Sequence, residues 1–128
     1  MRKEIENWWE QAKIDLKNAE VNLNQNIYYV CVFLCQQAVE KGLKSYFMIQ
    51  RGESPGTTHS LIYLATSCHV PQEHIDFLVK LTPEFIATRY PDVADEIPAR
   101  LYTEKTAQDI LNQSKRVFVW LEKQIKKH

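Results

Sequence analysis

The 128-residue sequence has few glycines, no long apolar run and no excess of charge of either sign. Its only glycines are Gly42, Gly52 and Gly56, and they cannot form G-x-G-x-x-G or G-x-x-x-x-G-K-[ST]. The phosphate loops of dinucleotide-binding and P-loop folds are therefore excluded. Sixteen Lys and Arg residues balance sixteen Asp and Glu residues, so that any site for a polyanion must be local.

Cysteine is scarce and odd in number, which does not suit a disulfide framework. Cys31 and Cys35 are one helical turn apart in an apolar run, where we expect them to be small buried hydrophobes. That run, residues 27–35, is well short of the about 20 residues that span a bilayer, and the N-terminal MRKEIENWWEQ lacks the apolar region of a signal peptide. We expect one domain over residues 1–128, cytoplasmic and without membrane contact.

Apolar residues recur at helical spacing over three long segments. They step by three and four from Ile5 to Leu23, which predicts a helix there. The turn-forming residues 24–26 follow, and a second helix is predicted over 27–50, because helical spacing continues beyond the strand-like IYYVCVFLC. The last helix is predicted from about Thr103 to the basic end KQIKKH, which suits the negative end of a helix dipole.

Shorter elements are predicted between the second and the last helix. After the breaker cluster 51–57, Thr58 is expected to cap a helix through about residue 65. The next helix follows Val70-Pro71, with Ile75, Leu78 and Val79 facing inward.

At residues 82–84, Thr-Pro-Glu, that helix is expected either to kink or to start again. Residues 90–102 contain two prolines and are expected to form a connection of about thirteen residues. The whole pattern predicts an all-α protein, an antiparallel up-and-down bundle of four or five helices without strands.

The central predicted helix carries a polar strip, CQQAVEKGLK, at residues 35–44. Gln37, Lys41 and Lys44 share one face by the three-and-four rule. Two interpretations are open: a solvated face with a Glu40–Lys44 pair, or a strip that faces a ligand or partner. Gly42 costs about 1 kcal/mol in a helix interior, which favours a close approach there by another backbone or a ligand.

Two further groups of residues are candidates for anion binding. His59 is expected in the first turn of a short helix, where backbone N–H groups attract anions, although a lone histidine near a cap is more often structural. In the segment Arg89-Tyr90-Pro91-Asp92, Arg89 suits a phosphate, Tyr90 suits a base, and Asp92 suits either Arg89 or a ribose hydroxyl. The alternative is a helix stop in which Asp92 only pins Arg89.

No metal site, cofactor or hydrolase triad is expected. Three of the four histidines and the cysteine outside the apolar run match no CxxC, HxxxH or HxxE spacing: His59, Cys68, His69 and His74. Serine and cysteine occur without GxSxG or a histidine placed to activate them. Trp8 and Trp9 are interpreted as core residues, with one of them at a subunit interface as the alternative.

Taken in order, these motifs resemble the HEPN domain family (higher eukaryotes and prokaryotes nucleotide-binding), and the resemblance covers nearly the whole chain. The motifs are WW-x2-A-x2-DL-x2-A at 8–19, Tyr28-x4-Phe33-x-CQQAVEKGLK, Gly52, His59-Ser60-Leu61, Arg89-Tyr90-Pro91-Asp92 and Val117-x2-Trp120-Leu121. The resemblance implies a helical bundle similar to the substrate-binding domain of nucleotidyltransferases, commonly a homodimer. In prokaryotes such proteins are often paired with a minimal nucleotidyltransferase, and several are toxins of toxin–antitoxin pairs.

Many members of that family are metal-independent RNases that carry R-x4-6-H, with Arg and His from both subunits meeting at the dimer cleft. This chain does not match that motif, because seven residues separate Arg51 from His59 and no histidine follows Arg89 at a usable distance. The resemblance therefore implies a non-catalytic protein that binds ATP or a similar nucleotide. The residues predicted to line its polar cleft are Lys41, Lys44, His59, Arg89, Tyr90 and Asp92.

Within that cleft, Arg89 and Lys44 are assigned to phosphate, Tyr90 to base stacking and Asp92 to orienting Arg89. One alternative is a toxin-like RNase that binds RNA, uses His59 as acid and base, and uses Arg51 or Arg89 as a phosphate clamp across a dimer. The other alternative is a structural dimer without ligand, in which residues 89–92 lock the fold.

Overall fold

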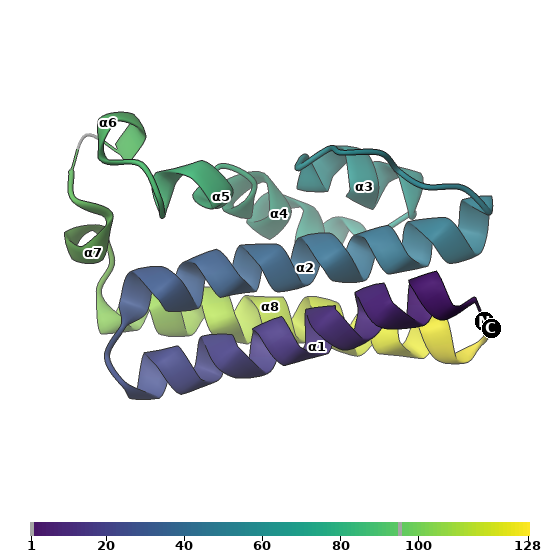
Figure 1. Ribbon diagram of the computed structural model, residues 1–128, viewed down its shortest axis with the longest axis horizontal. Helices are drawn as coiled ribbons and strands as arrows, with labels where there is room; N and C mark the ends of the chain where they lie inside the picture. The colour runs from purple at the N-terminus through teal and green to yellow at the C-terminus, as the bar shows by residue number, and fades with distance from the viewer. Residues whose placement is uncertain (1, 95) are drawn as a thin grey trace.

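The computed structural model describes residues 2–94 and 96–128, and within them the chain forms helices and no strand (Figure 1). The long helices α1 (Lys3–Asn24), α2 (Tyr28–Arg51) and α8 (Glu104–Lys126) lie side by side. The predicted all-α class and helical bundle are confirmed. No helix in the described part of the chain combines the length and the apolar character that crossing a membrane requires.

A series of short helices joins α2 to α8 and makes the bundle up-and-down. In chain order they are α3 (Leu61–Ser67), a 3₁₀ turn (Gln72–His74), α4 (Ile75–Leu81), α5 (Glu84–Ala87), α6 (Pro91–Ala94) and α7 (Pro98–Leu101). They lead the chain back along α2, so that α8 runs in the same direction as α2 and opposite to α1 (Figure 1). The described ends of the chain lie at the same end of the bundle (Figure 1).

The long helices begin and end at residues whose local chemistry explains their bounds, as predicted. Asn26, with φ at 63°, forms the turn between α1 and α2. Gly52 ends α2 in the left-handed conformation, φ 71°, and its N–H donates to the Met48 carbonyl at 2.9 Å. Thr103 caps α8: its Oγ1 accepts from the Thr106 N–H at 3.2 Å, and the Thr106 hydroxyl accepts from the Thr103 N–H at 2.9 Å.

The predicted cap of α3 is wrong by two residues. Ser60, not Thr58, is the N-cap, and its Oγ accepts from the Tyr63 N–H at 3.2 Å. The Thr58 hydroxyl instead accepts from the Ser60 N–H at 3.1 Å and forms the turn that precedes the helix. As a result His59 lies before the cap, in the loop, and not in the first turn of a helix.

Three other local predictions need correction or refinement. Val79 is 53% exposed, and Phe77 and Leu81 are buried with Leu78. A seven-residue helix has only two turns, so its apolar spacing does not show clearly which side faces the core. The helix at 82–84 does start again, with α5 beginning at Glu84. The expected loop at 90–102 contains α6 and α7, since a proline at the first position of each helix needs no N–H partner.

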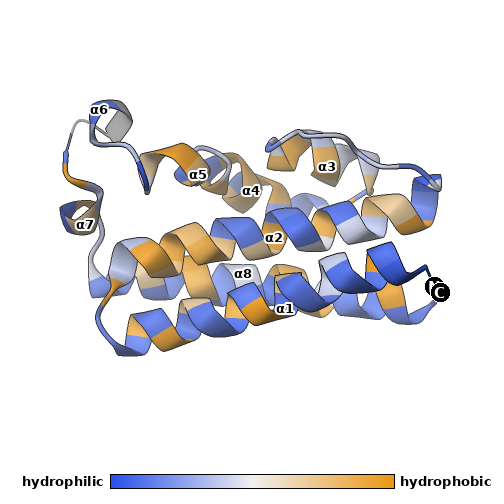
Figure 2. Cartoon of the chain, in the orientation of Figure 1, coloured by the Kyte–Doolittle hydropathy of each residue, from blue (hydrophilic) through white to orange (hydrophobic). Residues whose placement is uncertain are grey.

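The buried hydrophobic residues form two clusters. The larger lies where α1, α2, α3, α4 and α8 meet and includes Trp9, Leu43 and Phe118. The smaller lies near the α1–α2 turn and includes Cys31 and Cys35, which are free thiols and buried as expected. Hydrophilic and hydrophobic residues alternate along α1 and α8, whereas the first half of α2 is mostly hydrophobic (Figure 2).

The side chains that pack against α2 explain why residue 42 is a glycine. The sequence alone suggests a close approach by another backbone or by a ligand. A Cβ at residue 42 would lie 2.9 Å from Leu121 Cδ1 of α8 and 3.4 Å from Trp9 Cζ3 of α1. Both residues belong to the core, so neither can move freely. The glycine therefore lets α1 and α8 approach the middle of α2.

We predict that Gly42→Ala lowers the free energy of unfolding by about 1 kcal/mol, measured by urea denaturation. Alanine favours the helix by about 1 kcal/mol, but overpacking a core typically costs about 1–3 kcal/mol. Adding Leu121→Val to Gly42→Ala should recover part of the loss, because it removes the atom that the new methyl group meets. A Gly42→Ala variant more stable than the wild type would contradict this explanation.

Candidate functional site

A buried carboxylate, Glu40, lies at the middle of α2 and is 4% exposed. Its Oε1 accepts from Gln36 Nε2 at 3.0 Å and lies 2.9 Å from His59 Nδ1, while its Oε2 lies 3.2 Å from Lys44 Nζ. The Glu40–Lys44 pair exists, but it is buried, so the interpretation of this strip as a solvated face is wrong. Since an isolated buried charge is very costly, these partners are what allow Glu40 to lie inside the protein.

A second ion pair joins α2 to α1 on the same face. Lys41 Nζ lies 2.5 Å from Asp15 Oδ2, and Gln11 Nε2 donates to Asp15 Oδ1 at 2.8 Å. Asp15 is 6% exposed, whereas the Lys41 side chain keeps 23% of its surface exposed. We call the combined group the polar centre; it consists of Asp15, Gln36, Glu40, Lys41, Lys44 and His59.

His59 reaches the polar centre from the loop between α2 and α3. Its ring stacks on Phe85 of α5, with ring centroids 4.4 Å apart and planes 24° from parallel. Nδ1 donates to Glu40, while Nε2 has no partner among the described residues, and 48% of the side chain is exposed. The carboxylate therefore orients the imidazole and leaves Nε2 available at the surface.

Arg89 lies on the aromatic side chains next to His59. Its Cζ is 5.6 Å from the ring centroid of Phe85, 5.6 Å from that of Phe33 and 5.2 Å from that of Tyr90. Its Nε donates to the Phe85 carbonyl at 2.6 Å, which fixes the guanidinium. His59 and Arg89 thus share Phe85 as a neighbour. No ion pair joins Arg89 to Asp92 in the described part of the chain, so the Phe85 carbonyl takes the orienting role assigned to Asp92.

Two other candidate residues lie elsewhere: Lys44 is buried, and Arg51 lies apart from His59. The Lys44 side chain is 5% exposed, and its Nζ lies 5.5 Å from the ring centroid of Trp8, so it is too deep to reach a phosphate while paired with Glu40. Arg51 lies over Phe47, 5.6 Å from its ring centroid, and has no contact with His59 among the described residues. The two residues are therefore apart within one chain, and the RNase alternative, which pairs them across a dimer, stays a prediction.

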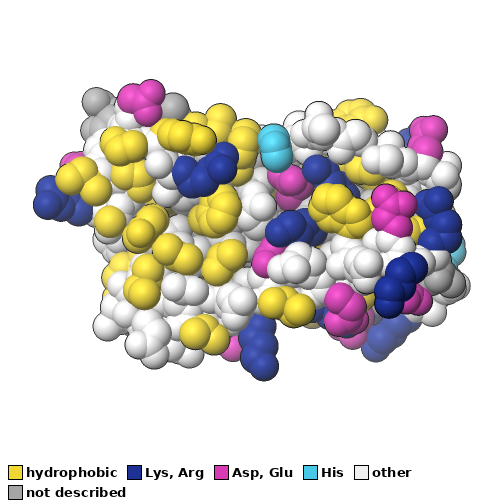
Figure 3. All heavy atoms as spheres, viewed as in Figure 1, with side chains coloured by type: hydrophobic (Ala, Val, Ile, Leu, Met, Phe, Trp, Pro, Cys, Tyr) yellow, Lys and Arg dark blue, Asp and Glu magenta, His cyan; other side chains and the backbone are white. Residues whose placement is uncertain are grey.

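A shallow hollow adjoins the polar centre. It has a volume of about 250 Å³ and is lined by Asn7, Trp8 and Gln11 of α1 and Lys41 of α2. Figure 3 shows, on one face of the molecule, a histidine with acidic and basic neighbours beside the middle of α2, between α5 and α3. Hydrophobic side chains gather over the half of this face that lies toward α6 and α7 (Figure 3).

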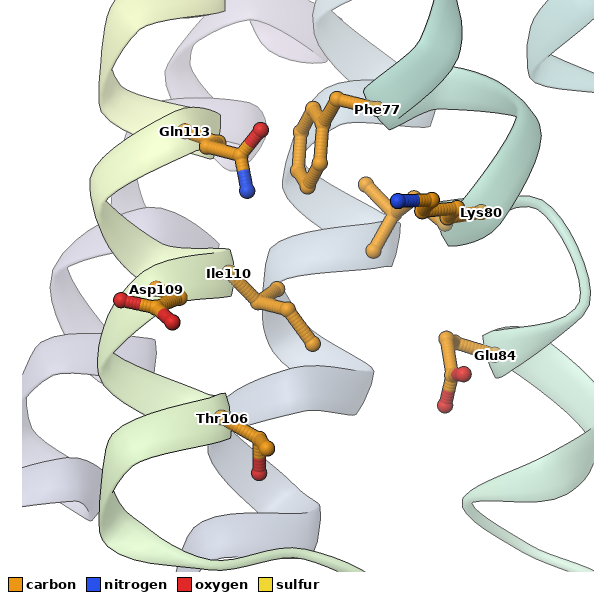
Figure 4. A pocket seen from close by; sticks show the side chains of 8 residues that line it. Phe77, Lys80, Glu84, Thr106, Asp109, Ile110 and Gln113 are labelled. Carbon is orange, nitrogen blue, oxygen red and sulfur yellow. The ribbon is translucent and has the colours of Figure 1, made fainter.

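A second pocket, of about 330 Å³, lies between α4, α5 and α8 (Figure 4). Phe77, Leu81 and Ile110 form its apolar part, and Glu84 lines it among other polar residues. Burial raises the pKa of Glu84, and the hydrogen bond donated by the Tyr102 hydroxyl partly opposes that rise. No residue of the predicted site lines this pocket.

The predicted site residues lack four that build the polar centre and its aromatic neighbour: Asp15, Gln36, Glu40 and Phe85. Gln36 and Glu40 lie in the polar strip 35–44 that the sequence singles out. The sequence does contain a signal for Asp15: it lies between Ala12 and Ala19 at helical spacing, on the side of α1 that is buried. A charged residue at such a position indicates a buried partner. The contact between His59 and Phe85 joins residues 26 positions apart, and no local pattern indicates it.

A family model and one solved structure name the same family for this chain. Residues 5–124 match the model of the HEPN domain. The crystal structure of TT1696 from Thermus thermophilus is similar with a TM-score of 0.85 and 29% identity, over 96% of this chain and 99% of that one. The crystal structure of ST0689, described as an archaeal HEPN homologue, is similar with a TM-score of 0.81 and 31% identity, over 98% and 99%. A comparison with curated proteins finds no match.

We predict that Glu40→Gln lowers the free energy of unfolding by about 3 kcal/mol, because it leaves Lys44 charged, buried and without a carboxylate. Lys44→Met should have a loss of similar size, and the double variant should lose less than the sum of the two. Urea denaturation measures all three.

The matched control is Glu10→Gln, which removes the exposed partner of Lys13 and should change the stability by less than about 1 kcal/mol. If Glu40→Gln behaves like Glu10→Gln, the buried pair does not stabilise the site.

Proposed function

The chain belongs to the HEPN domain family, and we propose that it is a nucleotide-binding accessory protein that works with a minimal nucleotidyltransferase, in a pair of the toxin–antitoxin type. The nucleotide is ATP or a similar one. The proposal requires a surface that binds phosphate and a base, and it requires no catalytic group.

The observation that carries this proposal is the arrangement of His59 and Arg89 around Phe85, next to the polar centre. Arg89 offers a planar set of donors that matches a phosphate, and it is exposed and held in place. Lys41 adds a donor on the same face, and His59 presents its Nε2 there. Tyr90, which the sequence assigns to base stacking, is 47% exposed beside Arg89.

The surroundings of Arg89 also support contacts with protein. Tyr90, Ile97 and Leu101 are large hydrophobic residues that are 47%, 45% and 40% exposed, and they lie in or beside α6 and α7. Hydrophobic side chains on that side of the molecule are seen together in Figure 3. Because apolar patches on a protein surface often mark interfaces, we propose a homodimer through this surface, which places Arg89 near the dimer contact.

One observation favours the second candidate, a metal-independent RNase. The contact between Glu40 and His59 Nδ1 is the arrangement that holds a histidine ready to exchange a proton at Nε2. In that function Arg89, and not Arg51, would hold the phosphate, since only Arg89 shares a neighbour with His59.

We predict that Arg89→Ala weakens the binding of ATP, GTP or a short RNA by at least tenfold in calorimetric titration, because charge-assisted bonds to phosphate are lost. Arg89→Lys should fall between the wild type and Arg89→Ala, since it keeps the charge but not the planar donors.

The control is Arg116→Ala, which removes an exposed arginine of α8 and should leave binding unchanged. All variants should keep the melting temperature of the wild type. A lower melting temperature in Arg89→Ala with unchanged binding would show that residues 89–92 lock the fold instead.

We predict that the wild type and His59→Ala both leave a labelled RNA intact in the presence of EDTA. Sedimentation in the same buffer should show a dimer, so that inactivity cannot be assigned to a missing subunit. Cleavage by the wild type that disappears in His59→Ala would replace the accessory function with the RNase.

A further inference from the structure

Two adjacent tryptophans of α1 have different environments, and the core accounts for only one of them. Trp9 is 9% exposed and stacks on Phe118, with ring centroids 5.3 Å apart. Trp8 is half-buried; Lys44 lies over its ring, and the ring also forms part of the hollow. Because its ring is left partly in water, covering Trp8 with a flat molecule lowers the free energy.

Polar groups beside Trp8 are not all used within the protein. Gln11 Nε2 donates to Asp15, which leaves Gln11 Oε1 as an acceptor. The Asn7 side chain has no hydrogen-bond partner among the described residues, so it offers both a donor and an acceptor. Residues four apart lie on the same face of a helix, so the two amides lie on one side of α1 together with Trp8.

We propose that the hollow lined by Asn7, Trp8, Gln11 and Lys41 binds an adenine ring, a step that rests on the nucleotide binding proposed above. Asparagine and glutamine recognise adenine with an oxygen that accepts from N6 and a nitrogen that donates to N7. Asn7, whose amide has both groups unused, can make this paired contact; guanine has an acceptor, O6, in place of the amino group, and it would face the oxygen of Asn7. Trp8 supplies the stacking surface.

The position of Lys41 links this hollow to the phosphate site. Lys41 lines the hollow, and Lys44, which lies over the Trp8 ring, is paired with the carboxylate that contacts His59. A nucleotide with its base on Trp8 then has Lys41 and Arg89 as the cationic groups for its phosphates. Trp8, rather than Tyr90, is the base-stacking residue in this arrangement, and Tyr90 remains on the apolar surface.

The test is a calorimetric titration with ATP, GTP, UTP and inorganic tripolyphosphate. We expect ATP to bind at least tenfold more tightly than GTP or UTP, since a bidentate amide contact discriminates between bases by about tenfold to a hundredfold. Asn7→Ala should remove that preference and leave tripolyphosphate binding unchanged. The matched control is Asn18→Ala, an exposed asparagine of α1 away from the hollow, which should bind like the wild type.

A second variant tests the stacking. Trp8→Leu should weaken ATP at least tenfold and tripolyphosphate not at all, because the contribution of an aromatic residue to base stacking is lost. Its circular dichroism and melting curve show whether it folds, and Asn7→Ala carries the test if it does not. A six-residue adenine oligonucleotide compared with a uracil one distinguishes adenine in RNA from the free nucleotide.

The outcomes separate this inference from the proposed function. Equal affinity for the three nucleotides, with tripolyphosphate still bound, overturns the adenine site and leaves phosphate binding in place. Binding that Asn7→Ala and Asn18→Ala weaken equally also overturns it. If neither tripolyphosphate nor any nucleotide binds, both proposals are wrong.

Discussion

The buried Glu40 carboxylate is the interaction on which the site depends. It has three partners from two different parts of the chain: Gln36 and Lys44 from its own helix, and His59 from the following loop. Its burial brings the loop onto α2, which brings His59 onto Phe85 and so places α5 and Arg89. It also holds Lys44 over Trp8, which fixes the ring at the edge of the hollow. One charge therefore positions both ends of the surface that we propose for a nucleotide.

The middle of helix α2 carries the polar centre on one side and contacts the core on the other, which explains why charged residues and a glycine occur together there. One side of its middle carries Glu40, Lys41 and Lys44, while Gly42 and Leu43 meet the core. Gly42 allows Leu121 and Trp9 to approach closely, so that α1 and α8 hold α2 firmly where the polar centre is built. Side chains on a well-packed helix are positioned more accurately than those on loops. The polar centre therefore has a rigid base, although His59 itself comes from a loop.

The sequence predicts the long helices well because each repeats its apolar spacing over about six turns, which leaves a single inward face. The seven-residue α4 has too few repeats, and there Val79 was placed inward where Phe77 and Leu81 belong. Of the predicted site residues, His59 and Arg89 share Phe85 and Tyr90 lies beside Arg89, while Lys41 pairs with Asp15; their role in binding stays a prediction. Their environment could not be predicted. A Glu and a Lys four residues apart have the same spacing on an exposed helix as in a core, and only the neighbours from α1 and the loop bury this pair.

Charge balance within the polar centre indicates which groups remain to bind an anion. Asp15 is paired with Lys41, and Glu40 is paired with Lys44, so the two lysines and the two carboxylates cancel. The added charge of a phosphate must then be met mainly by Arg89, which shares Phe85 with His59. Because His59 contacts Glu40 through Nδ1, its Nε2 is left at the surface on the same side of the molecule. A phosphate bound here would therefore contact one guanidinium and one imidazole that are both held against Phe85.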